Sequence, residues 1–107
     1  MDVGYRRIRI GSDLLVEVTK VDQGDYSLSS VDWDSVFYTD GAHKLSVPKD
    51  KAYKLDDDHY LCPVSTHKFN PGLLKGDLLV RIPNPYFESG IKNEINEIKL
   101  EKAYLER

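Results

Sequence analysis

An all-β fold, arranged as a sandwich or a small barrel of short strands, is what the sequence predicts. Apolar and polar residues alternate over several short runs, and turn-forming residues separate these runs about every 8 to 12 residues. The aromatic residues (three Phe, seven Tyr and one Trp) are types that strands favour. Because 107 residues fit around a single core, we expect one domain over residues 1–107.

Two strands are predicted near the start of the chain, at residues 5–10 and 14–21, with a turn between them. Each has apolar residues at every second position, as a strand with one buried face requires. The residues expected to face the core are Ile8, Ile10, Leu14, Val16 and Val18.

Residues 31–39 form the third predicted strand, reached through a connector or short edge strand at residues 26–30. Trp33 and Phe37 share one face with Ser35 between them, and they are the bulkiest core candidates in the chain. The Asp40-Gly41 pair that follows is a strong turn signal and is compatible with a tight hairpin.

The middle of the chain is less regular. Its predicted elements are short strands at residues 43–47, 51–55 and 59–64, a charged turn at residues 56–58, and a loop at residues 65–72. Pro63 interrupts the last of these strands, which indicates an edge or a strand end because proline has no N–H to donate.

The clearest strand runs from residue 74 to residue 82. Apolar or small residues occupy one face and mostly charged residues the other, with Leu79 as the exception. The inward positions are Leu74, Gly76, Leu78, Val80 and Ile82. Pro83 ends the strand, and residues 83–90 form a turn rich in Pro, Asn, Ser and Gly.

Two aromatic residues, Tyr86 and Phe87, lie within this turn. They either cap one end of the core or face a binding partner. Because aromatic side chains dominate the energetics of protein interfaces, Tyr86 and Phe87 are our candidate interface residues.

The segment from Ile91 to Arg107 is ambiguous. Its apolar residues stand at helical spacing, and Glu, Lys and Leu favour helices. As a strand, Ile98 and Tyr104 would share a face, but Ile91 and Ile95 would need a bulge to join them.

Charge and composition exclude several classes of protein. The net charge of −3 and pI near 5.5 argue against nucleic-acid binding, which needs a basic surface. No apolar run approaches the roughly 20 residues of a membrane span, and the N-terminus lacks the hydrophobic stretch of a signal peptide. We therefore expect synthesis in the cytoplasm, with no nucleic-acid or membrane partner.

Neither a catalytic nor a cofactor-binding nor a metal-binding constellation is predicted. Cys62 lies in an apolar run and is expected to be a buried, inert thiol. A nucleophilic pair with His67 would need the thiol to be exposed and the histidine to lie beside it. The cluster Asp56-Asp57-Asp58-His59 has the ligand types for a cation, but it lacks the glycine and the closing glutamate of a calcium loop. A solvated turn is the simpler interpretation.

The best-defined strand and turn resemble a segment of small phage and prophage virion proteins of gut Bacteroidales. In that group a PG-x-L turn leads to a strand, followed by IPD-x-x-FPDG and a charged, apolar run. Residues 7–14 (RIRIGSDL) are similar to the IRIGNDI opening of the same group. Asn84 and Ser89 replace acidic residues of the pattern, and Glu88 replaces a proline. The matching residues are Pro71, Gly72, Leu74, Ile82, Pro83, Phe87 and Gly90.

The resemblance implies an immunoglobulin-like β-sandwich of about seven short antiparallel strands, like the N-terminal domain of phage upper-baseplate proteins. It also favours a final strand from about residue 97 to residue 104 over a helix. A non-enzymatic virion assembly module is then expected, a tail, baseplate or fibre component that contacts other virion proteins or copies of itself.

Two other functions are compatible with the residues. A carbohydrate-binding sandwich would use tyrosines such as Tyr26, Tyr38, Tyr53 and Tyr60 together with the acidic turn. A metal-dependent enzyme would use residues 56–59.

Overall fold

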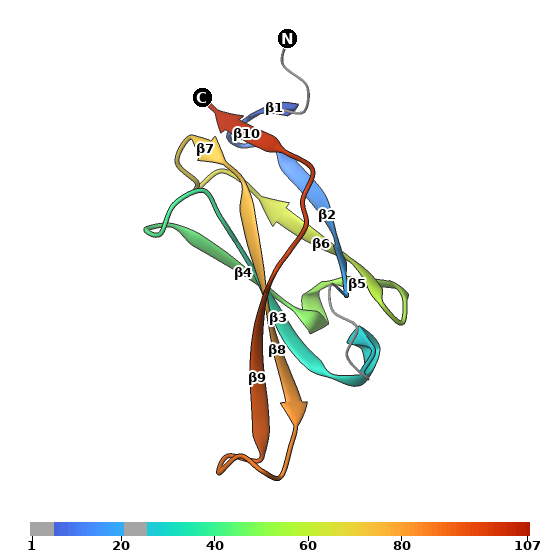
Figure 1. Cartoon of the computed structure of the whole chain (residues 1–107). Helices are drawn as coiled ribbons and strands as arrows, with labels where there is room; N and C mark the ends of the chain where they lie inside the picture. The colour runs from blue at the N-terminus through green and yellow to red at the C-terminus, as the bar shows by residue number, and fades with distance from the viewer. Residues whose placement is uncertain (1–5, 21–25) are drawn as a thin grey trace.

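The computed structural model describes residues 6–20 and 26–107, which fold mainly as strands in three sheets (Figure 1). The all-β prediction is confirmed. The strands are β1 (Arg6–Arg9), β2 (Asp13–Thr19), β3 (Asp32–Tyr38), β4 (Lys44–Pro48), β5 (Tyr53–Asp56), β6 (His59–Ser65), β7 (Gly72–Leu73), β8 (Lys75–Pro83), β9 (Ile91–Glu97) and β10 (Ala103–Glu106). Two short 3-10 helices, η1 (Leu28–Ser30) and η2 (Lys49–Lys51), complete the described elements.

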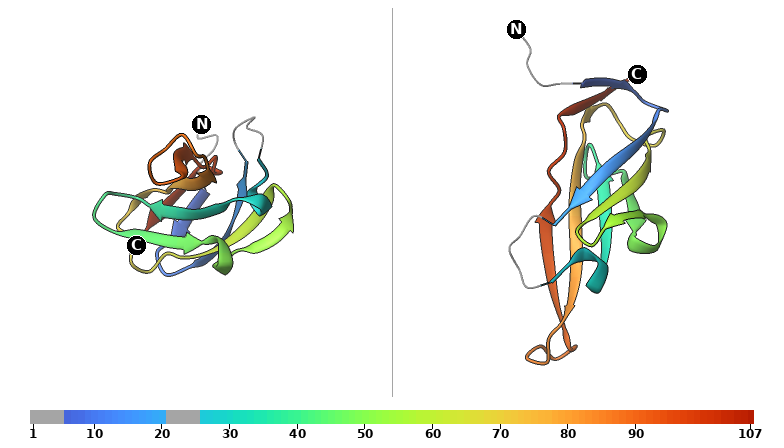
Figure 2. Two further views of the ribbon diagram at one scale, coloured as in Figure 1. Left: turned by 90° about the horizontal axis from the view of Figure 1, so that it is seen from below. Right: turned by 90° about the vertical axis from the view of Figure 1, so that its right-hand side faces the viewer.

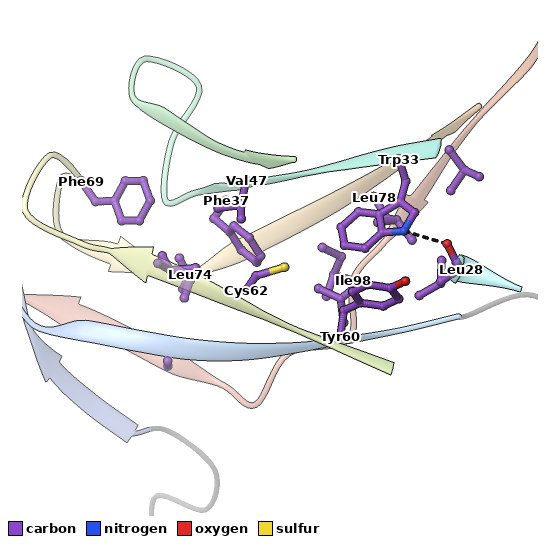
Figure 3. Close-up of a cluster of buried hydrophobic side chains, with 14 of the residues drawn as sticks. Leu28, Trp33, Phe37, Val47, Tyr60, Cys62, Phe69, Leu74, Leu78 and Ile98 are labelled. Carbon is purple, nitrogen blue, oxygen red and sulfur yellow. Dashed lines mark hydrogen bonds between the residues drawn. The ribbon is translucent and has the colours of Figure 1, made fainter. Parts of the chain in front are cut away.

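Two of the sheets, ordered β2-β6-β5 and β4-β3-β8-β9, pack their inner faces against each other. Trp33 on β3 meets Tyr60 on β6 edge-to-face, with ring centroids 5.1 Å apart (Figure 3). Beside this pair, Ser35 Oγ lies 3.5 Å from Cys62 Sγ. The core therefore forms where β3 crosses β6.

The inner face of β3 follows the predicted alternation, because Trp33, Ser35 and Phe37 are all fully buried. The polar atoms among them have partners: Trp33 Nε1 donates to the Leu28 carbonyl (3.1 Å) and the Ser35 hydroxyl donates to the Val47 carbonyl (2.7 Å). Buried polar groups need such partners to avoid a desolvation cost.

Glycine at position 76 allows close packing of β8 on β3. A Cβ there would lie 3.1 Å from the Phe37 ring and 3.2 Å from Ile98 Cδ1. The space that a side chain would occupy is filled by these two neighbours.

The expectation of about seven strands, all antiparallel, is wrong in number and in direction. The described residues hold ten strands, and β1 pairs in parallel with β10. Backbone hydrogen bonds join Arg6 N to Lys102 O (2.8 Å) and Ile10 N to Glu106 O (2.7 Å). With β7 on the other side of β10, these strands form the third sheet.

The structure decides between the alternatives for one local segment and corrects the turn of one hairpin. Residues 26–30 form a connector that includes the 3-10 helix η1, not an edge strand. The hairpin at Asp40 exists, but its turn is not tight, because Tyr38 pairs with Lys44 across a longer loop. Asp40 Oδ1 accepts hydrogen bonds from the N–H groups of Ala42 (3.0 Å) and His43 (3.1 Å), which fixes that wider turn. The predictions for Tyr5, Val21 and residues 23–25 lie outside the described residues.

Pro63 lies on β6, which is the central strand of its sheet and not an edge. It is paired with Leu15 of β2 on one side, whereas β5 pairs with β6 only from His59 to Leu61. The proline is therefore on a part of β6 whose second side is unpaired, which agrees with its missing N–H.

The last segment is not helical, so the prediction from apolar spacing is wrong. The final strand suggested for residues 97–104 is also displaced: β9 ends at Glu97 and β10 begins at Ala103. The chain between them leaves the ladder after Ile98, whose N–H still donates to the Gly76 carbonyl (2.8 Å). Ile98 is buried against the core, whereas Ile91 and Ile95 point to the opposite, exposed face.

The molecule is elongated, with principal extents of 48 × 28 × 26 Å. The β8–β9 hairpin projects from one end of the body, and β1 and β10 lie at the other end (Figures 1 and 2). The turn that carries Tyr86 and Phe87 is thus far from β1 and β10.

Candidate functional site

The tip of the β8–β9 hairpin presents the aromatic residues predicted as interface residues. Tyr86 is 94% exposed and Phe87 is 48% exposed. The alternative that they cap the core is therefore wrong, since the tip projects away from it. The interface role stays a prediction.

The turn that holds them is well fixed by hydrogen bonds. Asn84 N donates to Gly90 O and Gly90 N donates to Phe87 O, both at 2.8 Å, while Asn84 Oδ1 accepts from Tyr86 N at 2.9 Å. Gly90 has a φ of +77°, a conformation that side chains disfavour. A turn fixed in this way presents its aromatic rings at low entropic cost.

An apolar strip continues from the tip along the outer face of the sheet. We define it as Phe87, Ile91, Ile95 and Leu79. Ile95 is 72% exposed and lies directly opposite Leu79 on β8, and Ile91 is 39% exposed. Phe87 and Ile91 line a shallow hollow at the tip. Arg81 and Asn93 stand between Ile91 and Ile95 on this face, so the strip is interrupted by one polar pair.

The outer edge of β9 carries backbone groups without a strand partner, because β9 pairs with β8 alone in the part of the chain that the structure describes. Ile98 N donates to Gly76 O, and Gly90 O accepts from Asn84 N, so both groups point towards β8 and the turn after it. In an antiparallel pair the two backbone groups of one residue point the same way and alternate along the strand. The N–H and C=O groups of Asn93, Ile95 and Glu97 therefore point away from β8.

Charged side chains on the outer face of the β4-β3-β8-β9 sheet have polar partners. The Arg81 guanidinium contacts Asp32 at 2.8 Å and Asp34 at 2.9 Å, and these carboxylates raise its pKa. The Tyr38 hydroxyl donates to Asp77 at 3.0 Å, and this bond raises the pKa of the tyrosine. The outer face therefore offers apolar contacts and few unpaired charges.

A second exposed edge belongs to β2. It lines a groove of about 540 Å³ that continues past Leu74 to the connection between β9 and β10. The side chains on its two sides include Leu15, which is exposed, and Leu100. Pairing of β1 with β10 creates this groove, so no local sequence pattern could have indicated it.

The residues 56–59 form a hydrogen-bonded turn. His59 Nδ1 lies 2.6 Å from Asp56 Oδ1, which raises the pKa of the histidine and lowers that of the carboxyl. Lys54 pairs with Asp57 at 3.1 Å and lowers its pKa.

Asp58 faces a different element, because its Oδ1 accepts from Leu28 N at 3.2 Å. The three carboxylates thus serve separate partners. Among residues 6–20 and 26–107, no group of three or more His, Cys, Asp or Glu side chains is placed to hold a metal ion.

Cys62 is fully buried, as expected, and burial raises the pKa of its thiol. His67 is exposed, so the two residues are not arranged as a nucleophile and base. His43 contacts Asn70 Nδ2 at 3.3 Å, in a different loop from His59.

The four tyrosines considered for sugar binding do not form one face. Tyr60 is buried in the core and Tyr26 packs against it. Tyr38 lies on the outer side of the β4-β3-β8-β9 sheet, and Tyr53 is exposed on β5 of the other sheet.

Comparison of the chain with known proteins found no matching family model, no matching curated protein and no matching solved structure. No helix in the described part of the chain has the length and apolar character needed to cross a membrane.

Proposed function

We propose that this chain is a non-enzymatic assembly module of a phage virion, a component of the tail, baseplate or fibre that acts through protein–protein contacts. It would be made in the host cytoplasm and incorporated into the particle, with other virion proteins or further copies of itself as partners. The support is a resemblance in sequence combined with the geometry of one hairpin.

The observation that carries the proposal is the exposed apolar surface of the β8–β9 hairpin. Tyr86 and Phe87 lie on a hydrogen-bonded turn at the end of the molecule opposite to β1 and β10. The segment that resembles virion proteins, residues 71–95, includes this turn together with β8. A protein held through its other end would present the hairpin to a neighbour.

We also propose that the sandwich is immunoglobulin-like. Two antiparallel sheets of three and four strands pack face to face, which agrees with that architecture. A tryptophan fills the centre of the core, and Cys62 is a free cysteine, so packing takes the place of an inter-sheet disulfide.

No observation favours the carbohydrate-binding alternative, because its four tyrosines are divided between the core and two outer faces. The same holds for a metal-dependent enzyme at residues 56–59, whose carboxylates serve separate partners.

The test begins with the neighbouring genes. Tail, portal or baseplate genes beside this one are expected, and a polysaccharide-utilisation cluster would overturn the proposal. The products of these neighbours are then co-expressed with the chain and retained on it by an affinity tag.

A variant with both Tyr86→Ala and Phe87→Ala should lose the retained neighbour, whereas Tyr53→Ala, which removes an exposed aromatic side chain on another sheet, should keep it. Equal retention by both variants would show that the hairpin tip is not the contact surface. Specific binding to a glycan array, abolished by Tyr53→Ala, would favour the carbohydrate-binding alternative.

A further inference from the structure

The free edge of β9 has a self-complementary sequence. Residues 91–95 read Ile-Lys-Asn-Glu-Ile, which is symmetric about Asn93 when each Lys is matched with a Glu. The outer edge of this segment has no strand partner among the described residues. We propose that two copies of the chain pair antiparallel through β9, with a two-fold axis at Asn93.

The pairing follows from the geometry of antiparallel strands. With the axis at Asn93, Ile91 of one copy lies opposite Ile95 of the other, and Lys92 lies opposite Glu94. Both pairs occur twice because the interface is symmetric. Opposite charges and apolar residues placed directly across a ladder stabilise it.

The direction of the backbone groups agrees with this register. The N–H and C=O groups of Asn93 and Ile95 point outward. Asn93 would therefore bond to Asn93 of the second chain, and Ile95 would bond to Ile91 of the second chain. The outward groups of Ile91 now share the hydroxyl of Ser89, at 3.3 Å and 3.2 Å, and the second copy's Ile95 would replace that hydroxyl.

Neighbouring registers are less favourable. An axis at Glu94 or at Lys92 places two like charges directly opposite each other, which destabilises a ladder. An axis at Ile95 removes both Lys–Glu pairs. If the axis lay between two residues, a residue whose backbone groups point outward would face one whose groups point inward, and no ladder would form.

The pairing would join two four-stranded sheets into one continuous sheet. Ile95, which is 72% exposed in the single chain, would become covered along the outer face by Ile91 of the second copy. Each copy's tip would extend along the other copy's connection after Glu97. This inference rests on the proposed role of the hairpin as a contact surface, and it identifies the partner at its edge.

Charge reversal tests the pairing between chains. Lys92→Glu leaves two carboxylates at positions 92 and 94, and Glu94→Lys leaves two ammonium groups. Each variant alone should weaken self-association about tenfold or more in sedimentation velocity, because each places like charges opposite each other twice. A mixture of the two variants should associate again, since every cross-pair then joins opposite charges.

The mixture also controls for the ion pair that Lys92 and Glu94 form within one chain, at 3.9 Å. That intrachain pair stays broken in both variants, so it cannot account for renewed association. Thermal unfolding of each variant establishes that it folds. A natural chain that stays monomeric at all concentrations, or a mixture that stays monomeric, would overturn the proposal.

A disulfide test reports the register. Asn93→Cys should oxidise to a covalent dimer rapidly, because residues facing each other in a hydrogen-bonded pair have Cα atoms about 5.5 Å apart, within disulfide range. Glu97→Cys lies on the same exposed strand but far from the axis, and should oxidise slowly. Equal rates would overturn the register.

Failure of this inference and failure of the proposed function differ in outcome. A monomeric chain that still retains a virion neighbour through Tyr86 and Phe87 overturns the self-pairing and leaves the assembly role intact. A dimer that forms as proposed beside a gene neighbourhood unrelated to phages overturns the virion role and leaves the pairing intact.

Discussion

Strand β8 belongs to two regions with different properties, the sandwich body and the projecting hairpin. In the body, Gly76, Leu78 and Val80 face the core and are buried. Towards the hairpin, the pairing with β3 ends at Arg81, and β9 alone continues alongside the strand to Pro83. On the outer face at this end the apolar residues Phe87 and Ile91 are exposed, whereas Ile82 on the inner face still packs against the core.

The difference separates two groups of apolar side chains in one continuous ladder, one buried and one exposed. Burial of Trp33 and its neighbours contributes stability, whereas the apolar strip contributes little while it faces water. Substitutions should therefore divide by region: those in the body change the free energy of unfolding, and those at the tip change contacts with other chains.

The largest effect is expected in the body. Trp33→Ala removes a fully buried ring, its edge-to-face contact with Tyr60 and its bond to the Leu28 carbonyl. The free energy of unfolding should fall by about 3–5 kcal/mol in urea titrations. Tyr86→Ala is the control and should change it by less than about 0.5 kcal/mol. Comparable losses in both variants would remove the distinction between the two regions.

A side chain added at position 76 should overpack the contact between β8 and the core. Gly76→Ala places a methyl group 3.1 Å from the Phe37 ring, so we expect a loss of about 1–3 kcal/mol in the same titrations. Gly41→Ala is a suitable control, because a Cβ there meets nothing within 4 Å. A neutral Gly76→Ala would show that Phe37 and Ile98 can move apart freely.

At the root of the hairpin the effect should be smaller. Arg81→Ala breaks contacts to Asp32 and Asp34 that are partly exposed, so the loss should be about 1 kcal/mol or less. Arg81→Lys should restore only part of it, because an ammonium group cannot reproduce the planar fork. Both losses should shrink at high salt, and a loss independent of salt would contradict an electrostatic cause.

The smallest effect concerns the exposed pair of Asp56 and His59, at the turn between β5 and β6 on the surface of the body. Because folding raises the pKa of His59, its contribution is present at low pH and is lost as the pH rises through that raised pKa. Asp56 has a lowered pKa, so its contribution is lost as the pH falls through that lowered value. Asp56→Asn should return the His59 pKa towards its ordinary value in an NMR titration, whereas Asp50→Asn should leave it unchanged.

The body was largely predictable from sequence because its residues alternate with the strand period. This alternation places Trp33, Ser35 and Phe37 on one buried face, and Pro83 marks the end of β8. Cys62 was correctly expected to be buried.

The hairpin was harder to predict. Ile91 and Ile95 lie on the exposed face and Ile98 on the buried one, and this combination produces the spacing of a helix. Alternation in sequence cannot show which face meets water when both carry isoleucine. The turn residues were identified, but their position away from the core depends on where β3 stops pairing with β8.

The parallel pairing of β1 with β10 has a mechanical consequence. The register from Arg6 with Ala103 to Arg9 with Glu106 places Arg6 and Glu106 at opposite ends of one short ladder. A force that pulls those two residues apart shears the ladder and loads its hydrogen bonds together, whereas an antiparallel pair would open one bond at a time. A sandwich held by its ends under tension would resist extension first at this ladder, before the load reached the core around Trp33.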